Sequence, residues 1–283
     1  MVKIKVDLQR RENLRRLHTA THIINFSARK VLGNHVWQNG SNLKEEFGTL
    51  DITHYDQLTQ EEIFKIERLT NETIFENKTV EIEELDRTKA EEKFGFSLYQ
   101  GGAIPMKTLR VIKVEESDIE ACGGIHMQST GGIGYVKIVE SQKIQDGVVR
   151  LKYVVRDFAA NFIEEKQKLL NLVKEVFSVD DTSLVKTSEK FFNEWKEQKK
   201  TIDKLKIQLK DTFISQIIGS DITEFNLVGD YDMGFLMDIF NGVLFEKNTF
   251  KLIGDKFIIA TNDLSVQAYK KSIPKGKYNI YVM

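Results

Sequence analysis

The spacing of apolar and polar residues predicts a long helix near the start of the chain. Apolar side chains recur at steps of three and four from about residue 10 to 32, as on one face of an amphipathic helix, and Gly33 is suited to cap its C-terminal end. Residues 1–9 alternate between apolar and polar. They are therefore expected to form a short strand or a lead-in to the helix.

Strands dominate the pattern that follows. The stretch 35–55 predicts two strands, with Asn39-Gly40 as the hairpin turn between them. Thr59 and Glu62 have capping-box spacing, which predicts the start of a helix that runs to about residue 76. Further strands are predicted at 80–85, 109–114, 133–140 and 148–156. Together these elements predict an α+β fold, with an antiparallel sheet packed on helices.

The pattern changes after residue 157, which divides the chain into three predicted domains: 1–157, 158–218 and 219–283. The middle domain is expected to be helical. Its second helix carries a heptad-like apolar stripe formed by Trp195, Ile202, Leu205, Leu209, Phe213 and Ile217. The stripe predicts either an intramolecular helical hairpin or pairing with a second chain. The last domain shows short strands around an apolar helix near 232–245, which predicts a small α/β module.

Composition narrows the class of protein. Of the 283 residues, 41% are hydrophobic and 29% are charged, as in an ordinary chain with a real core. A net charge of −1 provides no overall basic field, and no apolar run is long enough to span a membrane, so we expect neither DNA nor a membrane as a partner. The single cysteine, Cys122, excludes an intramolecular disulfide. A reducing, cytoplasmic location is expected.

Four side chains have the chemistry of a zinc site. His18 and His22 are one helical turn apart, and Cys122 and His126 have the same spacing with two glycines between them. Three nitrogens and one sulfur suffice for a tetrahedral zinc shell. Two buried histidines and a buried thiol are the alternative without a metal. The other two histidines in the first domain, at positions 35 and 54, are left out of the shell and are expected at the surface or at a cap.

Three motifs resemble the editing domain of alanyl-tRNA synthetases of the archaeal type. They are HTATH at 18–22, VWQNGS at 36–41 and CGGIH at 122–126, and the stretch from Gly132 to Arg150 resembles the end of the same domain. The resemblance covers about the first 157 residues, and the rest of the chain is more weakly similar to the C-terminal domain of that family. It implies that the chain hydrolyses Ser-tRNA(Ala) and Gly-tRNA(Ala), with zinc held by His18, His22, Cys122 and His126.

The same resemblance implies roles for two further residues. Thr21 would hydrogen-bond the hydroxyl of a mischarged serine, and Gln38 would hold the ester or the reacting water. Without the resemblance, Thr21 would be expected to bond the carbonyl four residues earlier, and Gln38 to face solvent. Zinc would either activate the water or orient the amino group of the substrate. The orienting role is preferred, because four protein ligands leave no open position.

The sequence shows no ATP-binding motif. It also shows no glycine-rich loop before the first helix, where Met1 lies only seventeen residues before His18. We therefore expect either an excised segment or a separate editing subunit. Expected partners are the acceptor end of tRNA(Ala) and either an aminoacylating subunit, which would supply the ATP-dependent chemistry, or a second copy through 158–218. Two alternatives remain: a free-standing trans-editing deacylase, and a non-catalytic RNA-binding or assembly module with structural zinc.

Overall fold

The computed structural model describes residues 5–100, 102, 104–221, 223–226, 233–244, 251–254, 257–261, 272–275 and 278–282. The chain divides into two compact units, residues 1–172 and residues 173–283. The architecture mixes helices with antiparallel sheets, which confirms the predicted α+β class. The three predicted domains, with boundaries after residues 157 and 218, stay a prediction.

The first unit contains a four-stranded antiparallel sheet in the order β1-β2-β7-β6. Its strands are β1 (Gln38–Leu43), β2 (Gly48–Thr53), β6 (Val136–Gln145) and β7 (Val148–Val155). The helices α1 (Leu8–Leu32) and α2 (Gln60–Phe75) pack on it. Inward-facing residues of the sheet and both helices form the main core, which contains Ile24, Ile66, Leu50 and Leu151.

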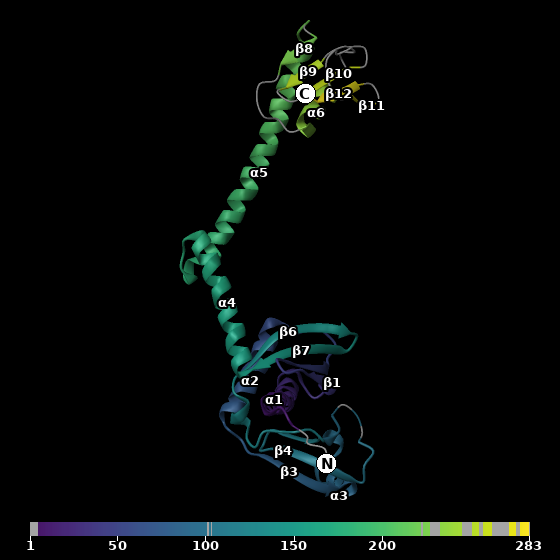
Figure 1. Cartoon of the computed structure of the whole chain (residues 1–283), viewed down its shortest axis with the longest axis vertical. Coiled ribbons are helices and arrows are strands. Elements are labelled where there is room, and N and C mark those ends of the chain that lie inside the picture. The colour runs from purple at the N-terminus through teal and green to yellow at the C-terminus, as the bar shows by residue number, and fades with distance from the viewer. Residues whose placement is uncertain are drawn as a thin grey trace. The chain divides into compact units, whose positions relative to one another are not determined.

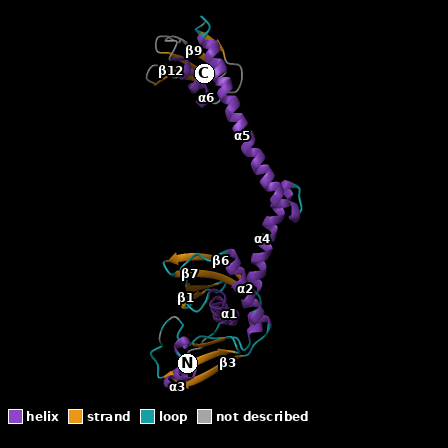
Figure 2. Cartoon of the chain, turned by 180° about the vertical axis from the view of Figure 1, so that it is seen from behind, coloured by secondary structure: helices purple, strands orange, loops and turns teal. Residues whose placement is uncertain are grey.

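A second, three-stranded antiparallel sheet has the order β3-β4-β5. It consists of β3 (Val80–Asp86), β4 (Thr108–Val114) and β5 (Asp118–Ala121), with α3 (Arg87–Phe94) between the first two strands. Two short 3-10 turns, η1 (Phe96–Leu98) and η2 (Thr130–Ile133), complete the unit. Figures 1 and 2 both show α1 between the two sheets, so one helix can present side chains to both of them.

Local chemistry explains where α1 begins and ends. The Asp7 side chain accepts a hydrogen bond from the Arg10 amide, which caps the N-terminus. At the other end the Gly33 amide donates to the Arg29 carbonyl, and the φ of Gly33 is 115°, a value that favours glycine. Residues 19–25 of the helix are all buried, because α1 lies inside the unit. Polar side chains in this stretch, including His22, are therefore held in the interior.

The predicted hairpin turn at Asn39-Gly40 is wrong. Both residues lie within β1, where the pairing register with β2 shifts between Gln38 and Gly40, so the dipeptide forms a bulge. The chain turns later, where the Lys44 amide donates to the Phe47 carbonyl at 2.9 Å. Residues 1–4 of the predicted N-terminal strand lie outside the described residues.

The second unit joins helices to a five-stranded sheet. The helix α4 (Arg156–Phe177) contains the boundary between the units, and α5 (Asp181–Ile218) and α6 (Met233–Leu244) follow. The sheet order is β11-β12-β10-β9-β8, with bounds β8 (Glu224–Asn226), β9 (Lys251–Gly254), β10 (Phe257–Thr261), β11 (Ser272–Lys275) and β12 (Tyr278–Val282). Ile217 packs with Leu236, Ile239 and Phe240 of α6 in a separate core. Among the described residues, no helix is long and apolar enough to cross a membrane.

Candidate metal centre

The structure brings together the four side chains that the sequence singled out. His18 and His22 project from α1, and Cys122 and His126 lie in the loop that follows β5. Their candidate ligand atoms all lie within 4.8 Å of one another. The Cys122 Sγ is 3.3 Å from the His18 Nε2, although 104 residues separate them in the chain. Three imidazoles and a thiol therefore surround one point.

Two arginines and a threonine hold the backbone of the loop. The Arg110 Nη1 donates to the carbonyl oxygens of Cys122 and Gly124, each at 2.7 Å. From the α1 side, the Arg15 Nε and Nη2 both donate to the His126 carbonyl, at 3.1 and 3.0 Å. The Met127 amide donates to the Thr19 Oγ1 at 2.9 Å. These bonds tie the loop to both β4 and α1 without involving any of the four candidate ligand atoms.

The two glycines of the loop have different surroundings. A Cβ added at Gly124 would lie 1.8 Å from the His18 Cε1, so the helix and the loop approach as closely as they do only because residue 124 has no side chain. A Cβ at Gly123 would meet no heavy atom within 4 Å. Neither glycine has a positive φ. The close approach of the loop to α1 therefore depends on Gly124 and not on Gly123.

The electrostatics of the cluster favour a bound cation. Burial tends to raise the pKa of the Cys122 thiol, but its contacts with the three imidazoles outweigh burial and lower the pKa to about 3. Burial lowers the pKa of His126 to about 4, so its ring is neutral near pH 7. Both ring nitrogens of His126 are buried without a hydrogen-bond partner among the described residues. A thiolate beside a neutral imidazole with an unused nitrogen fits a metal ion that takes N and S ligands.

Two buried carboxylates, which the sequence reasoning missed, face the same cluster. The His22 Nδ1 lies 3.0 Å from the Asp118 Oδ2 and 3.1 Å from the Glu120 Oε2. Burial lowers the pKa of His22, but Glu120 and Asp118 outweigh it and raise the pKa well above the usual value. Their spacing gave a signal, because residues 118 and 120 alternate along β5 and so share a face, and Cys122 follows at the same two-residue step.

Thr21 is buried, and its hydroxyl already has partners. The Oγ1 lies 2.9 Å from the Leu17 carbonyl and 2.6 Å from the Tyr153 hydroxyl, which is itself 3.0 Å from the same carbonyl. Each hydroxyl carries one proton, so these three oxygens share two protons. Thr21 has no further proton to donate, and toward any additional group its oxygen is an acceptor only.

Gln38 is partly buried at the start of β1. Its backbone amide donates to the Gln100 Oε1 at 3.1 Å.

The two histidines that were left out of the predicted zinc shell lie apart from the four candidate ligands. The His35 Nε2 and the His54 Nδ1 lie 2.9 Å from each other, and the two rings stack. His54 is buried and His35 is exposed.

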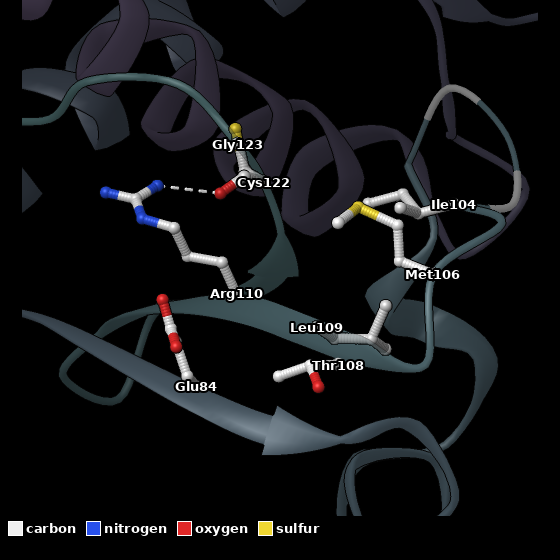
Figure 3. A pocket seen from close by; sticks show the side chains of 8 residues that line it. All are labelled: Glu84, Ile104, Met106, Thr108, Leu109, Arg110, Cys122 and Gly123. Atoms are coloured by element: carbon white, nitrogen blue, oxygen red, sulfur yellow. Dashed lines mark hydrogen bonds between the residues drawn. The ribbon is translucent and has the colours of Figure 1, made fainter.

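A cavity of about 330 Å³ opens beside the loop (Figure 3). Its lining residues are Glu84, Ile104, Met106, Thr108, Leu109, Arg110, Cys122 and Gly123. Figure 3 shows the Cys122 carbonyl oxygen turned toward the Arg110 guanidinium, and the sulfur pointing away from the other lining side chains. The cavity thus reaches the loop from the β4 side, and neither Thr21 nor Gln38 belongs to its lining.

Comparison with known proteins shows which family the chain resembles. Residues 109–152, from β4 to β7, match the family model described as the threonyl and alanyl tRNA synthetase second additional domain. The chain is 39% identical over 266 residues to the alanine–tRNA ligase of Methanococcus maripaludis strain C6. It is 43% identical over 213 residues to the enzyme of the same name from Thermococcus kodakarensis, and 38% identical over 280 residues to that from Methanocella arvoryzae.

The chain is homologous to part of archaeal alanine–tRNA ligases. The three matches cover 93%, 75% and 98% of this chain, but only 29%, 23% and 32% of the respective ligases. The resemblance read from the HTATH and CGGIH motifs is thereby confirmed. The family model contains Cys122 and His126, whereas the half of the cluster on α1 lies outside the matched residues.

The two loop glycines provide a matched pair of variants. Gly124→Ala is expected to weaken Zn²⁺ binding by about tenfold or more, because the new methyl group must displace the His18 ring. Gly123→Ala is expected to bind as the wild type does, since its methyl group enters open space. Competition with a colorimetric chelator measures both affinities. Equal affinities in the two variants would contradict the role given to Gly124.

Proposed function

We propose that this chain is the editing part of an alanyl-tRNA synthetase, a zinc-dependent hydrolase that removes serine or glycine from mischarged tRNA(Ala). The observation that carries the proposal is the convergence of His18, His22, Cys122 and His126 around one point, in a chain homologous to alanine–tRNA ligases. An aminoacylation site cannot reject glycine strongly by size, so a second site that hydrolyses the wrong ester serves fidelity.

In this proposal, the protein provides a rigid, partly buried shell for the ion. The donor set of three imidazoles and a thiolate is suited to Zn²⁺, which would orient the amino group of the substrate. The hydrogen bonds that Arg15 and Arg110 donate to the loop, and the one that Thr19 accepts from it, keep the loop in place. Little backbone reorganisation is therefore required when the ion binds.

Thr21 and Gln38 are proposed to contact the substrate. Because the Thr21 hydroxyl has no proton left to donate, it would accept a hydrogen bond from the serine hydroxyl, which neither alanine nor glycine has. Gln38 would hold the ester or the reacting water from the start of β1. A seryl group would gain this hydrogen bond and an alanyl group would not, so Ser-tRNA(Ala) would be preferred over the correctly charged tRNA.

The helical segment 158–218 is proposed to pair with a second copy of the chain or with an aminoacylating subunit. Several members of the apolar stripe on α5 are exposed, among them Trp195 (47%), Ile202 (53%) and Leu205 (56%). Toward the end of the helix, Phe213 and Ile217 pack instead on the core formed with α6. The exposed part of the stripe therefore supports association with another chain, whereas its C-terminal part packs in the core of the second unit.

Deacylation of Ser-tRNA(Ala) tests the proposed activity. The wild-type protein is expected to hydrolyse Ser-tRNA(Ala) and to leave Ala-tRNA(Ala) intact. Cys122→Ala and chelator-treated wild type are expected to hydrolyse at the background rate, because each removes part of the metal site. Release of labelled serine measures the rate. Zinc-loaded wild type without activity would instead favour an RNA-binding module with structural zinc.

Thr21→Val tests the recognition of serine. Valine keeps the shape of threonine and lacks the hydroxyl, and Tyr153 can still donate to the Leu17 carbonyl. Hydrolysis of Ser-tRNA(Ala) is expected to fall by roughly 2- to 10-fold, the effect of one hydrogen bond, while hydrolysis of Gly-tRNA(Ala) is unchanged. The ratio of the two rates is the measurement. An equal fall for both substrates would show that Thr21 does not read the side chain.

The oligomeric state tests the association surface. Ile202→Lys combined with Leu205→Glu is expected to shift a dimer of the full chain to monomer, because both substitutions place charge in an apolar seam. Lys204→Gln lies between them on another face of α5 and is the matched control. Sedimentation equilibrium gives the mass. A wild-type protein that is already monomeric would leave the aminoacylating subunit as the proposed partner.

A further inference from the structure

A series of hydrogen-bonded polar side chains lies on the buried side of the candidate metal site. Behind His22 stand Asp118 and Glu120, and all three side chains are at most 5% exposed. Both carboxylates approach the same atom, the His22 Nδ1, and belong to β5, the strand that leads into the Cys122 loop. Surface ion pairs contribute little to stability. Burying a carboxylate costs desolvation free energy unless another group interacts with it, so the burial of both Asp118 and Glu120 requires a physical reason.

One explanation is that the pair positions His22. A carboxylate that accepts the Nδ1 proton fixes the tautomer of the ring, so that Nε2 is free to bind a metal, and it also restricts rotation of the ring. A shell of Zn²⁺, one thiolate and three neutral imidazoles carries a net charge of +1, and a buried carboxylate beside it compensates that charge. The geometry around His22 therefore matches the second layer of a metal site.

The contacts extend from Glu120 to the strand that carries Gln38. The Asn25 Nδ2 donates to the Glu120 Oε1 at 3.0 Å and to the Gln100 Oε1 at 3.2 Å. The same Gln100 oxygen accepts the Gln38 amide at 3.1 Å, and the Gln100 Nε2 donates to the Ser97 carbonyl at 3.1 Å. Asn25 is fully buried and lies seven residues after His18 on α1, on the helical face of both ligands.

We propose that Asp118, Glu120 and Asn25 form a positioning layer that orients His22 toward the metal and, through Gln100, fixes the Gln38 strand relative to it. None of the four residues would touch the ion itself. The proposal rests on the proposed function only for the identity of the ion and for the role of Gln38. It adds that the metal half-site and the strand at Gln38 are held by one continuous set of hydrogen bonds.

The affinity for Zn²⁺ tests the inner end of this layer. Asp118→Asn and Glu120→Gln are each expected to weaken binding by about 10- to 100-fold, the usual effect of removing an outer partner of a metal ligand. Glu67→Gln is the matched control, because Glu67 is also buried but bonds the Ile138 amide and Lys137 on the α2 side of the core. It is expected to bind as the wild type does. Chelator competition provides the affinities.

A spectroscopic measurement separates positioning from general damage to the fold. In Co²⁺-loaded protein, the ligand-field bands of Asp118→Asn and Glu120→Gln are expected to shift because the His22 ring turns, while the thiolate charge-transfer band of Cys122 remains. Identical spectra and affinities in all variants would overturn the proposal. So would two Zn²⁺ ions per wild-type chain, since His22, Asp118 and Glu120 would then hold an ion of their own.

The outer end is tested by hydrogen exchange of the Gln38 amide. Gln100→Ala removes its acceptor and is expected to accelerate exchange by roughly 2- to 10-fold, with Zn²⁺ affinity unchanged. Removing Zn²⁺ from the wild type is expected to accelerate exchange at the same amide. Gln100 is only partly buried, so this variant remains informative should a β5 variant fail to fold. Exchange at Gln38 that is unaffected by zinc would refute the connection.

The outcomes distinguish this proposal from the proposed function. A wild-type protein that binds no Zn²⁺ and hydrolyses no Ser-tRNA(Ala) would defeat the proposed function. A wild-type protein that binds one Zn²⁺ and hydrolyses the ester, with Asp118→Asn and Glu120→Gln indistinguishable from it, would defeat the positioning layer alone.

Discussion

The structure of the first unit depends on one contact between distant parts of the chain: the approach of the CGGIH loop to the buried face of α1. His18 and His22 lie one turn apart on that helix, and Cys122 and His126 meet them from the loop. Four polar donors gathered in a partly buried place would be costly without a common partner. An ion that binds all four removes this cost, so the same contact explains both the fold around α1 and the chemistry assigned to it.

The loop is placed by groups other than the donors themselves. Its carbonyl oxygens are taken up by Arg110 and Arg15, and Gly124 leaves room for the His18 ring. The helix is placed in turn by its burial between two sheets (Figure 2). Contacts to the backbone therefore position the four candidate ligands. The buried carboxylates of Asp118 and Glu120 then orient the His22 ring.

Much of this arrangement was accessible from the sequence because it follows from local rules. The 3.6-residue period indicated α1, the Thr59–Glu62 box indicated α2, and identical spacing in the two pairs of donors indicated a shared site. The error at Asn39-Gly40 has a physical origin. The dipeptide suits a tight turn and also a bulge. The bulge forms where β1 pairs with β2, and β2 is itself held by its pairing with β7, a contact that is not local.

Other features could not be read from local patterns. Arg15 and Arg110 donate to backbone carbonyl groups more than ten residues away, and no periodicity marks such contacts. Asn25 and Gln100 are 75 residues apart and meet only because α1 and the segment after η1 pack together. By contrast, Asp118 and Glu120 had a signal in their alternation with Cys122. The signal was overlooked because β5, only four residues long, was not recognised as a strand.

The distance along the chain between the two halves of the candidate metal centre has a consequence for how the protein folds during synthesis. An ion that joins His18 to Cys122 closes a loop of 104 residues. By analogy with a covalent cross-link of about 100 residues, restricting the unfolded chain in this way contributes on the order of 4–5 kcal/mol. During synthesis, the α1 half is made first, and only its two histidines are available until Cys122 and then His126 have left the ribosome. Availability of zinc at that moment would then influence how much newly made protein reaches the native state.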